Sequence, residues 1–175
     1  SGVIHRTFGY NNVGFHMNDS LVTFDVDGPL TDEDIKLVEK KANEAIYANN
    51  SIKAIYPTPE ELPDYDYRSK LDITEGVRLI EIENTDLCAC CAPHVARTGE
   101  VGIIKITSYI PYKKGTRIEM ICGALALNDY INLHNANKRI MNMLSVKRFE
   151  TPVAVERIQT ELSNARNKKK KLSSE

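Results

Sequence analysis

The chain has 175 residues, of which 42% are hydrophobic and 27% are charged. These proportions are those of an ordinary soluble globular protein, and they exclude a disordered or a fibrous chain. No apolar run approaches the roughly 20 residues that a membrane-spanning helix needs, and the first residues lack the layout of a signal peptide. We therefore expect a cytoplasmic protein with no membrane partner.

The formal net charge of −1 conceals an uneven distribution of charge along the chain. Residues 1–130 contain 13 basic and 20 acidic residues, whereas residues 131–175 contain 10 basic and 4 acidic residues. An acidic body with a charge of −7 is thus followed by a basic arm with a charge of +6. We predict a domain over 1–130 and a helical arm over 131–175 that serves as a linker or a dimerisation segment.

Helices and strands are both predicted in the body. Residues 3–8 have the spacing of one helix face, and residues 20–27 alternate like a strand. Thr31 is expected to cap a helix that continues to about residue 49, with Asp34 at the third helical position as in a capping box. Further strands are predicted at 52–56, at 77–82, and in a hairpin formed by 101–110 and 116–122.

The arm is predicted to be helical from about residue 124, with Thr151-Pro152 separating two helices. Val155, Ile158 and Leu162 give the last helix a narrow apolar seam, which suits packing against a partner helix. The predicted fold is α+β: a mostly antiparallel sheet with a central helix, followed by a C-terminal helical arm.

A cluster of thiol and imidazole groups is the most informative feature of the sequence. Three cysteines and a histidine lie within seven residues: Cys88, Cys90, Cys91 and His94. Zinc takes four such ligands in structural sites, and three with a water molecule in catalytic sites. Cys90 and His94 can reach one ion across a turn that Pro93 stiffens, with Cys88 as a neighbouring candidate. We favour a metal site over cysteines packed in the core, although further ligands must come from elsewhere.

The other histidines offer few additional ligands. We expect His5 and His134 to lie at the surface. His16 precedes a predicted strand, and a pocket wall and a solvated loop are equal alternatives for it.

Four sequence motifs together resemble a known family. They are G-F-H-M-N-D-S-L-V-T-F-D-V-D-G-P-L-T at 14–31, C-A-C-C-A-P-H-V at 88–95, T-G-E-V-G-I-I-K-I at 98–106 and K-G-T-R-I-E-M-I-C-G-A-L-A-L at 114–127. In this order they closely resemble the editing domain of alanyl-tRNA synthetase and the free-standing AlaX-type alanyl-tRNA editing proteins. The resemblance covers roughly residues 1–130, and the basic arm is similar to the region that follows the editing domain in longer members.

The resemblance implies a zinc site. The family combines H-x-x-x-H on a helix with C-x-x-x-H on a loop, and Cys90 and His94 match the second motif. The first motif does not occur in this sequence, in which Ser1–His5 resembles the stretch directly after it. With two ligands, we expect zinc binding to be weak or substoichiometric. Whether this chain alone acts as an enzyme stays open.

The implied function is zinc-dependent hydrolysis of tRNA for alanine that carries serine or glycine, by an aminoacyl-tRNA deacylase or as part of an alanyl-tRNA synthetase. The implied partner is the acceptor end of tRNA, and a homodimer through the C-terminal helices is a further expectation. Substrate-pocket candidates are Asn12, Phe15 and His16. Candidates for contact with RNA are Lys105, Arg117, Lys138, Arg139, Lys147 and Arg148.

Two alternatives remain at this point. The first is a non-catalytic module, in which a structural metal knuckle carries a basic helical arm for RNA docking or dimerisation. The second is the related editing domain of threonyl-tRNA synthetase, which shares the layout of the zinc motifs.

Overall fold

The computed structural model describes residues 1–69 and 75–172, which form two compact units, Ser1–Leu127 and a second that begins at Asn128. The elements of the first unit are, in chain order, α1 (Gly2–Phe8), β1 (Asn12–Met17), β2 (Val22–Val26), α2 (Asp32–Tyr47), β3 (Ile52–Ile55), the 3₁₀ turn η1 (Leu62–Asp64), β4 (Leu79–Ile82), β5 (Asp86–Ala89), the 3₁₀ turn η2 (Thr98–Val101), β6 (Ile104–Tyr112) and β7 (Gly115–Cys122). Helix α3 (Gly123–Leu144) begins in this unit and continues into the second, which also contains α4 (Thr151–Leu172).

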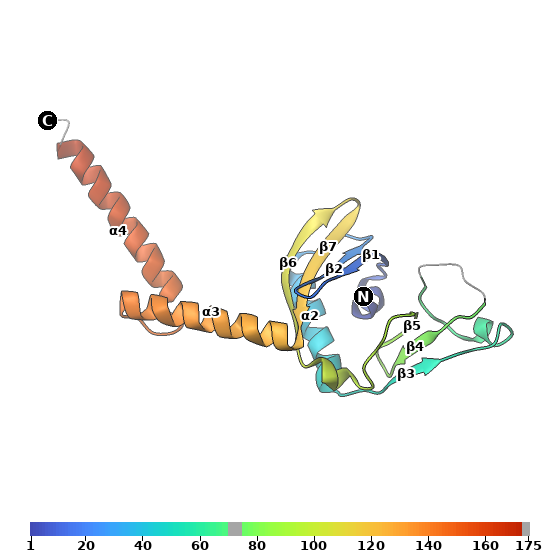
Figure 1. Cartoon of the computed structure of the whole chain (residues 1–175). Coiled ribbons are helices and arrows are strands. Elements are labelled where there is room, and N and C mark those ends of the chain that lie inside the picture. The colour runs from blue at the N-terminus through green and yellow to red at the C-terminus, as the bar shows by residue number, and fades with distance from the viewer. Residues whose placement is uncertain (70–74, 173–175) are drawn as a thin grey trace. The chain divides into compact units, whose positions relative to one another are not determined.

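The strands form two antiparallel sheets (Figure 1). The larger sheet has the order β1-β2-β7-β6, and the smaller has the order β3-β4-β5. With α2 packed on the larger sheet, this arrangement confirms the predicted α+β class. The predicted hairpin is confirmed as β6–β7, closed by Lys113, which has a positive φ of 53°, and Lys114.

Helix α2 begins where the sequence predicts. The Thr31 hydroxyl accepts a hydrogen bond from the Asp34 backbone N–H, and the Asp34 carboxylate accepts one from the Thr31 N–H, which completes a capping box. Three acidic residues in the first turn complement the positive end of the helix dipole. Ile35 and Val38 then lie on the buried face.

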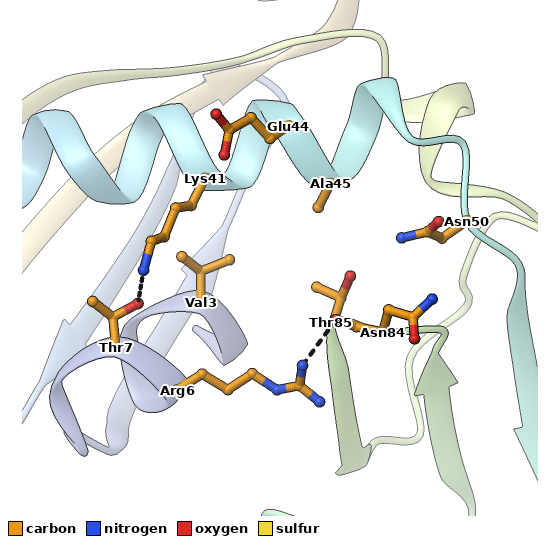
Figure 2. Close-up of a pocket in the computed structure, with 9 residues that line it drawn as sticks. All are labelled: Val3, Arg6, Thr7, Lys41, Glu44, Ala45, Asn50, Asn84 and Thr85. Carbon is orange, nitrogen blue, oxygen red and sulfur yellow. Dashed lines mark hydrogen bonds between the residues drawn. The ribbon is translucent and has the colours of Figure 1, made fainter.

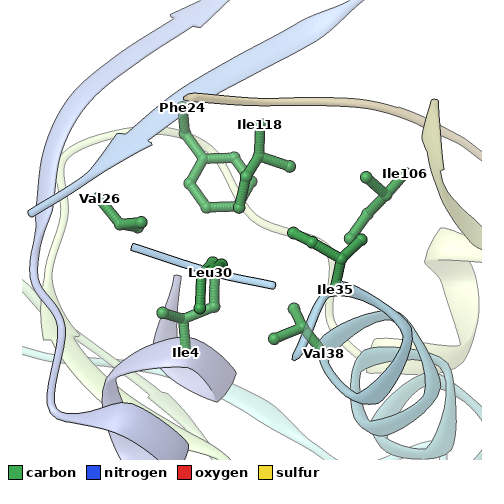
Figure 3. Close-up of a cluster of buried hydrophobic side chains, with 8 residues drawn as sticks. All are labelled: Ile4, Phe24, Val26, Leu30, Ile35, Val38, Ile106 and Ile118. Atoms are coloured by element: carbon green, nitrogen blue, oxygen red, sulfur yellow. The ribbon is translucent and has the colours of Figure 1, made fainter. Parts of the chain in front are cut away.

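The main core lies between the larger sheet and the two N-terminal helices (Figure 3). Phe24 and Ile118 are direct neighbours on β2 and β7, and Ile118 is completely buried. Ile4 from α1 and Ile35 from α2 approach the same cluster. A second, smaller cluster around Leu79 supports the three-stranded sheet.

Strand β6 is the outer strand of the larger sheet, and α2 satisfies part of its backbone. The Glu39 carboxylate accepts a hydrogen bond from the Ile106 N–H, and the Asn43 side chain both accepts from the Ile104 N–H and donates to the Ile104 carbonyl. The helix thus takes the place of a neighbouring strand at the start of β6.

Two strands were not anticipated from the sequence. Residues 12–17 form the edge strand β1 and not a loop, so His16 lies on a strand and not before one. Residues 86–89 form β5, which places Cys88 on a strand opposite Ile80. Their patterns are weak because β1 is exposed along most of its length and β5 has only four residues.

The second unit consists of the later part of α3, a turn and α4. The Thr151 hydroxyl donates to the Asn137 side chain, whose amide in turn donates to the Arg148 carbonyl. The seam residues Val155, Ile158 and Leu162 are between 39 and 48% exposed, so they are only partly covered within the chain. Across the described residues of both units, no helix is long and apolar enough to cross a membrane.

The core makes a direct prediction about stability. Ile118→Ala removes a completely buried side chain between Phe24 and Tyr109, and should lower the free energy of unfolding by about 2–5 kcal/mol. Ile110→Ala, on the adjacent strand at a position that is 53% exposed, should cost less than about 1 kcal/mol. Urea unfolding of both variants checks this, and equal losses would contradict the assigned core.

Candidate functional site

The cysteine- and histidine-bearing loop follows the edge of the smaller sheet. Cys88 lies on β5, and the chain leaves the strand at Cys90, whose N–H donates to the Arg78 carbonyl. Cys90 is half-buried, whereas Cys91 and His94 are exposed. The structure therefore brings Cys90 and His94 onto one short loop, as the C-x-x-x-H motif suggests.

The guanidinium of Arg78 ties this loop together. One nitrogen, Nη1, donates to the carbonyls of Cys90 and Ala92, both at 2.8 Å. Hydrogen bonds from a charged donor are stronger than neutral ones, so these two contacts fix the backbone on either side of Cys91. Arg78 precedes β4, and the sequence gives no sign of this role.

The same carbonyl of Ala92 orients His94. The imidazole Nδ1 lies 2.8 Å from the Ala92 oxygen, which can only accept a hydrogen bond. In a neutral ring, Nδ1 must therefore carry the proton, and Nε2 keeps its lone pair. This is the arrangement found in metal-ligating histidines, whose second nitrogen donates to a carbonyl or carboxylate.

The described residues supply only part of a metal site. All four cysteines are free thiols, and burial raises the pKa of Cys88 to about 11, with the nearby Asp86 carboxylate as a second cause. Within 1–69 and 75–172, no three histidine, cysteine or acidic side chains gather closely enough to hold an ion. Thiolate and imidazole are both donors that zinc accepts, so the residue types of Cys90 and His94 suit two of the four positions of a zinc site.

The chain after the loop is anchored to the end of α2. The Arg97 guanidinium donates to the Asn49 carbonyl, and the Thr98 hydroxyl donates to the carbonyl of Ala45. The Asn50 N–H donates to the Thr98 hydroxyl oxygen. Thr98 is buried, so these bonds form in a site largely shielded from water.

The three residues predicted for a substrate pocket lie on β1 without sharing one wall. Phe15 pairs with Phe24 and His16 with Thr23, and successive strand residues point to opposite faces. Phe15 is 57% exposed, and the Asn12 side chain accepts a hydrogen bond from the Gly14 N–H of its own strand.

The two cations predicted on the sheet for RNA contact are paired with carboxylates. Lys105 Nζ lies 2.8 Å from Glu39. Arg117 donates two hydrogen bonds to Asp25, at 2.7 and 2.9 Å, and stacks 3.7 Å above the Tyr112 ring. The bonds to Asp25 raise the pKa of Arg117 and hold its charge in place.

The cations predicted in the arm lie on the surface. The residues concerned are Lys138, Arg139, Lys147 and Arg148, all of which are exposed. Arg148 donates to the Tyr130 hydroxyl and lies 5.3 Å from the Phe149 ring centre, so its charge is oriented by aromatic neighbours.

The position of His5 corrects one expectation. His134 is exposed, but His5 is only half-exposed, and its Nδ1 is buried without a hydrogen-bond partner in the described part of the chain. The short helix α1 packs against α2 and β5.

A hollow of about 320 Å³ lies between α1, α2 and the turn that joins β4 to β5 (Figure 2). Arg6 and Thr7 approach it from α1, Lys41 from α2, and Asn84 from the turn. None of the motif residues at 88–95 lines it. Sequence patterns did not indicate this cavity, since its walls are far apart along the chain.

The comparisons with known proteins agree with this domain architecture. Residues 77–119 match the family described as the threonyl and alanyl tRNA synthetase second additional domain. The matched segment runs from β4 through the Cys90–His94 loop to the β6–β7 hairpin.

Curated relatives are alanine--tRNA ligases. Similarity extends over 143 residues to the enzyme of Ignicoccus hospitalis (29% identity, 79% of this chain and 16% of the relative) and over 134 residues to that of Halobacterium salinarum (32%, 74% and 14%). The Rickettsia typhi enzyme is 28% identical over 182 aligned positions, which cover 99% of this chain and 20% of the relative. The chain thus spans 14 to 20% of the length of these relatives. The chain therefore belongs to the alanyl-tRNA synthetase family, and its resemblance to the editing domain of that family is confirmed.

The contacts of Arg78 predict how the loop responds to substitution. Arg78→Gln removes the charged donor from two carbonyls, so the backbone order parameters of residues 90–94 should fall and the Cys90 amide should exchange at least several-fold faster. Lys53→Gln, which removes a charge from neighbouring strand β3, should change neither. NMR relaxation and hydrogen exchange on metal-free protein check this. An unchanged loop in Arg78→Gln would contradict the role given to Arg78.

Proposed function

We propose that this chain acts in proofreading of tRNA for alanine, by hydrolysing the ester that joins a wrong amino acid, serine or glycine, to the tRNA. The observation that carries the proposal is the family match over 77–119, which contains the ordered Cys90–His94 loop. The similarity to alanine--tRNA ligases over most of the chain favours the alanyl over the threonyl type.

The need for such a reaction follows from the size of alanine. A pocket that accepts alanine discriminates weakly against glycine, because a missing methyl group is worth only about 1–3 kcal/mol. A second site must then remove the wrong product. Selectivity for serine over alanine can come from polar groups that bond the serine hydroxyl and are left unpaired when alanine enters.

We propose Cys90 and His94 as two ligands of a zinc ion. The Nδ1 contact of His94 leaves Nε2 as the donor, and Arg78 holds the loop that carries both side chains. When bound, zinc supplies a Lewis acid that can orient a substrate or polarise a water molecule. Cys88 is the less suitable thiol, since burial raises its pKa to about 11 and a ligand must be a thiolate.

The proposed partner is the acceptor end of tRNA. The arm contains 10 basic and 4 acidic residues, so its net charge is positive, and exposed lysine and arginine side chains bind phosphate in a salt-dependent way. The half-exposed seam of α4 is proposed to pack against a second copy of the chain, because Val155, Ile158 and Leu162 recur at the spacing of a coiled-coil face.

Deacylation of tRNA for alanine charged with serine, glycine or alanine tests the function. The chain, and any longer natural form of it, should release serine and glycine faster than alanine. Cys90→Ser and His94→Ala should each lower the rate at least tenfold, while Cys91→Ser should not. Hydrolysis of none of the three substrates by the longest form, or of alanine as fast as serine, would contradict the proposal.

The competing function is a non-catalytic metal knuckle with an RNA-binding arm. Metal analysis by mass spectrometry discriminates between the two when read together with the assay. Tight stoichiometric zinc that depends on Cys88 as well as Cys90, in a protein without deacylase activity, would favour the knuckle.

A further inference from the structure

Two cations face the hollow between α1, α2 and the β4–β5 turn, although the body is acidic (Figure 2). Arg6 extends from α1 toward the turn, and Lys41 extends from α2 toward α1. The volume of about 320 Å³ lies at the lower end of the range for ligand sites, which is about 300–1,000 Å³.

Both cations are positioned by neutral groups. Arg6 Nη1 donates to the Asn84 carbonyl at 2.8 Å, and Lys41 Nζ donates to the Thr7 hydroxyl at 3.1 Å. Among the residues described, neither forms an ion pair with a carboxylate. A guanidinium has five N–H donors and an ammonium has three, so each keeps donors for a ligand.

Three other cations of the body differ in this respect. Arg68, Lys105 and Arg117 each lie against a carboxylate within hydrogen-bonding distance. A carboxylate already compensates their charge, and a phosphate would have to displace it. Arg6 and Lys41, which have no such carboxylate partner among the residues that the structure describes, are therefore better placed to bind an anion than these three cations, although the body as a whole is acidic.

We propose that this hollow binds a backbone phosphate of the RNA partner. The inference rests on the proposed function for the identity of that partner. None of the nine lining residues is aromatic, so the hollow offers no ring for stacking a base or a free nucleotide. A contact to phosphate alone positions an RNA without reading its sequence.

One acidic residue, Glu44, also lines the hollow and opposes an anion there. Its carboxylate lies 3.8 Å from Lys40 Nζ, on the same helix, and this exposed ion pair partly compensates its charge. Lys40 itself does not line the hollow. Lys36 is also exposed on α2 and outside the hollow, and its loss leaves the Lys40–Glu44 pair intact, so it is the matched control for Lys41.

The test is binding of uncharged, fluorescently labelled tRNA for alanine to the full chain, measured by anisotropy at several salt concentrations. Lys41→Gln and Arg6→Gln should each weaken binding roughly three- to tenfold at low salt and reduce the slope of log K against log salt by about one. Lys36→Gln, with the same loss of charge, should weaken it less than twofold, and Glu44→Gln should tighten it. Thermal unfolding of each variant confirms that it is folded.

Equal effects of Lys36→Gln and Lys41→Gln would overturn the inference, because they would show a response to net charge alone. Inorganic phosphate, followed by amide chemical shifts, distinguishes the source of the ligand. Phosphate could shift the Arg6 and Lys41 resonances while Lys41→Gln leaves the affinity for tRNA unchanged. In that case the hollow binds a free phosphate compound, and the proposal that it binds an RNA phosphate is wrong. Since the assay uses uncharged tRNA, failure of deacylation would leave this result standing.

Discussion

The structure of the first unit depends on the polar contacts that α2 makes with the chain from Arg97 to Ile106. β6 is an outer strand whose first residues would otherwise present free backbone groups, and such groups are costly when shielded from water. Glu39 and Asn43 satisfy them from the helix, and the buried Thr98 joins the helix end to the chain just after the Cys90–His94 loop. The capping box at Thr31 fixes where this helix begins. It thereby helps to position Glu39 and Asn43 against β6, and the end of the helix against Thr98.

These contacts relate the fold to the proposed chemistry. The Cys90–His94 loop is held from the sheet side by Arg78, and the segment that follows it is held from the helix side through Thr98. A ligand loop that is ordered at both ends loses little further freedom on binding a metal or a substrate, which favours binding. The cations of the hollow, Arg6 and Lys41, are also held in place by hydrogen bonds. Their acceptors are neutral, so the positive charges are oriented without being neutralised.

The sequence predicted the elements whose signals are local. The capping box, the β6–β7 hairpin and the C-x-x-x-H spacing all depend on residues a few positions apart. By contrast, the pairing of Lys105 with Glu39 joins residues 66 positions apart, and that of Arg117 with Asp25 joins residues 92 apart. No local pattern distinguishes these cations from Lys41 or Arg6. For the same reason, sequence patterns did not predict the hollow, the hydrogen bonds from Arg78 to the Cys90–His94 loop, or the buried Nδ1 of His5.

We propose that the Cys90–His94 loop contacts the 3′ end of tRNA, whereas the basic arm contacts other parts of the same RNA. Photo-crosslinking from an 8-azidoadenosine placed at the 3′ terminus of tRNA for alanine tests this most directly, with the attached peptide identified by mass spectrometry. The account predicts a crosslink within residues 86–98, competed by unlabelled tRNA. A crosslink confined to residues 131–172 would contradict it and favour an RNA-docking module.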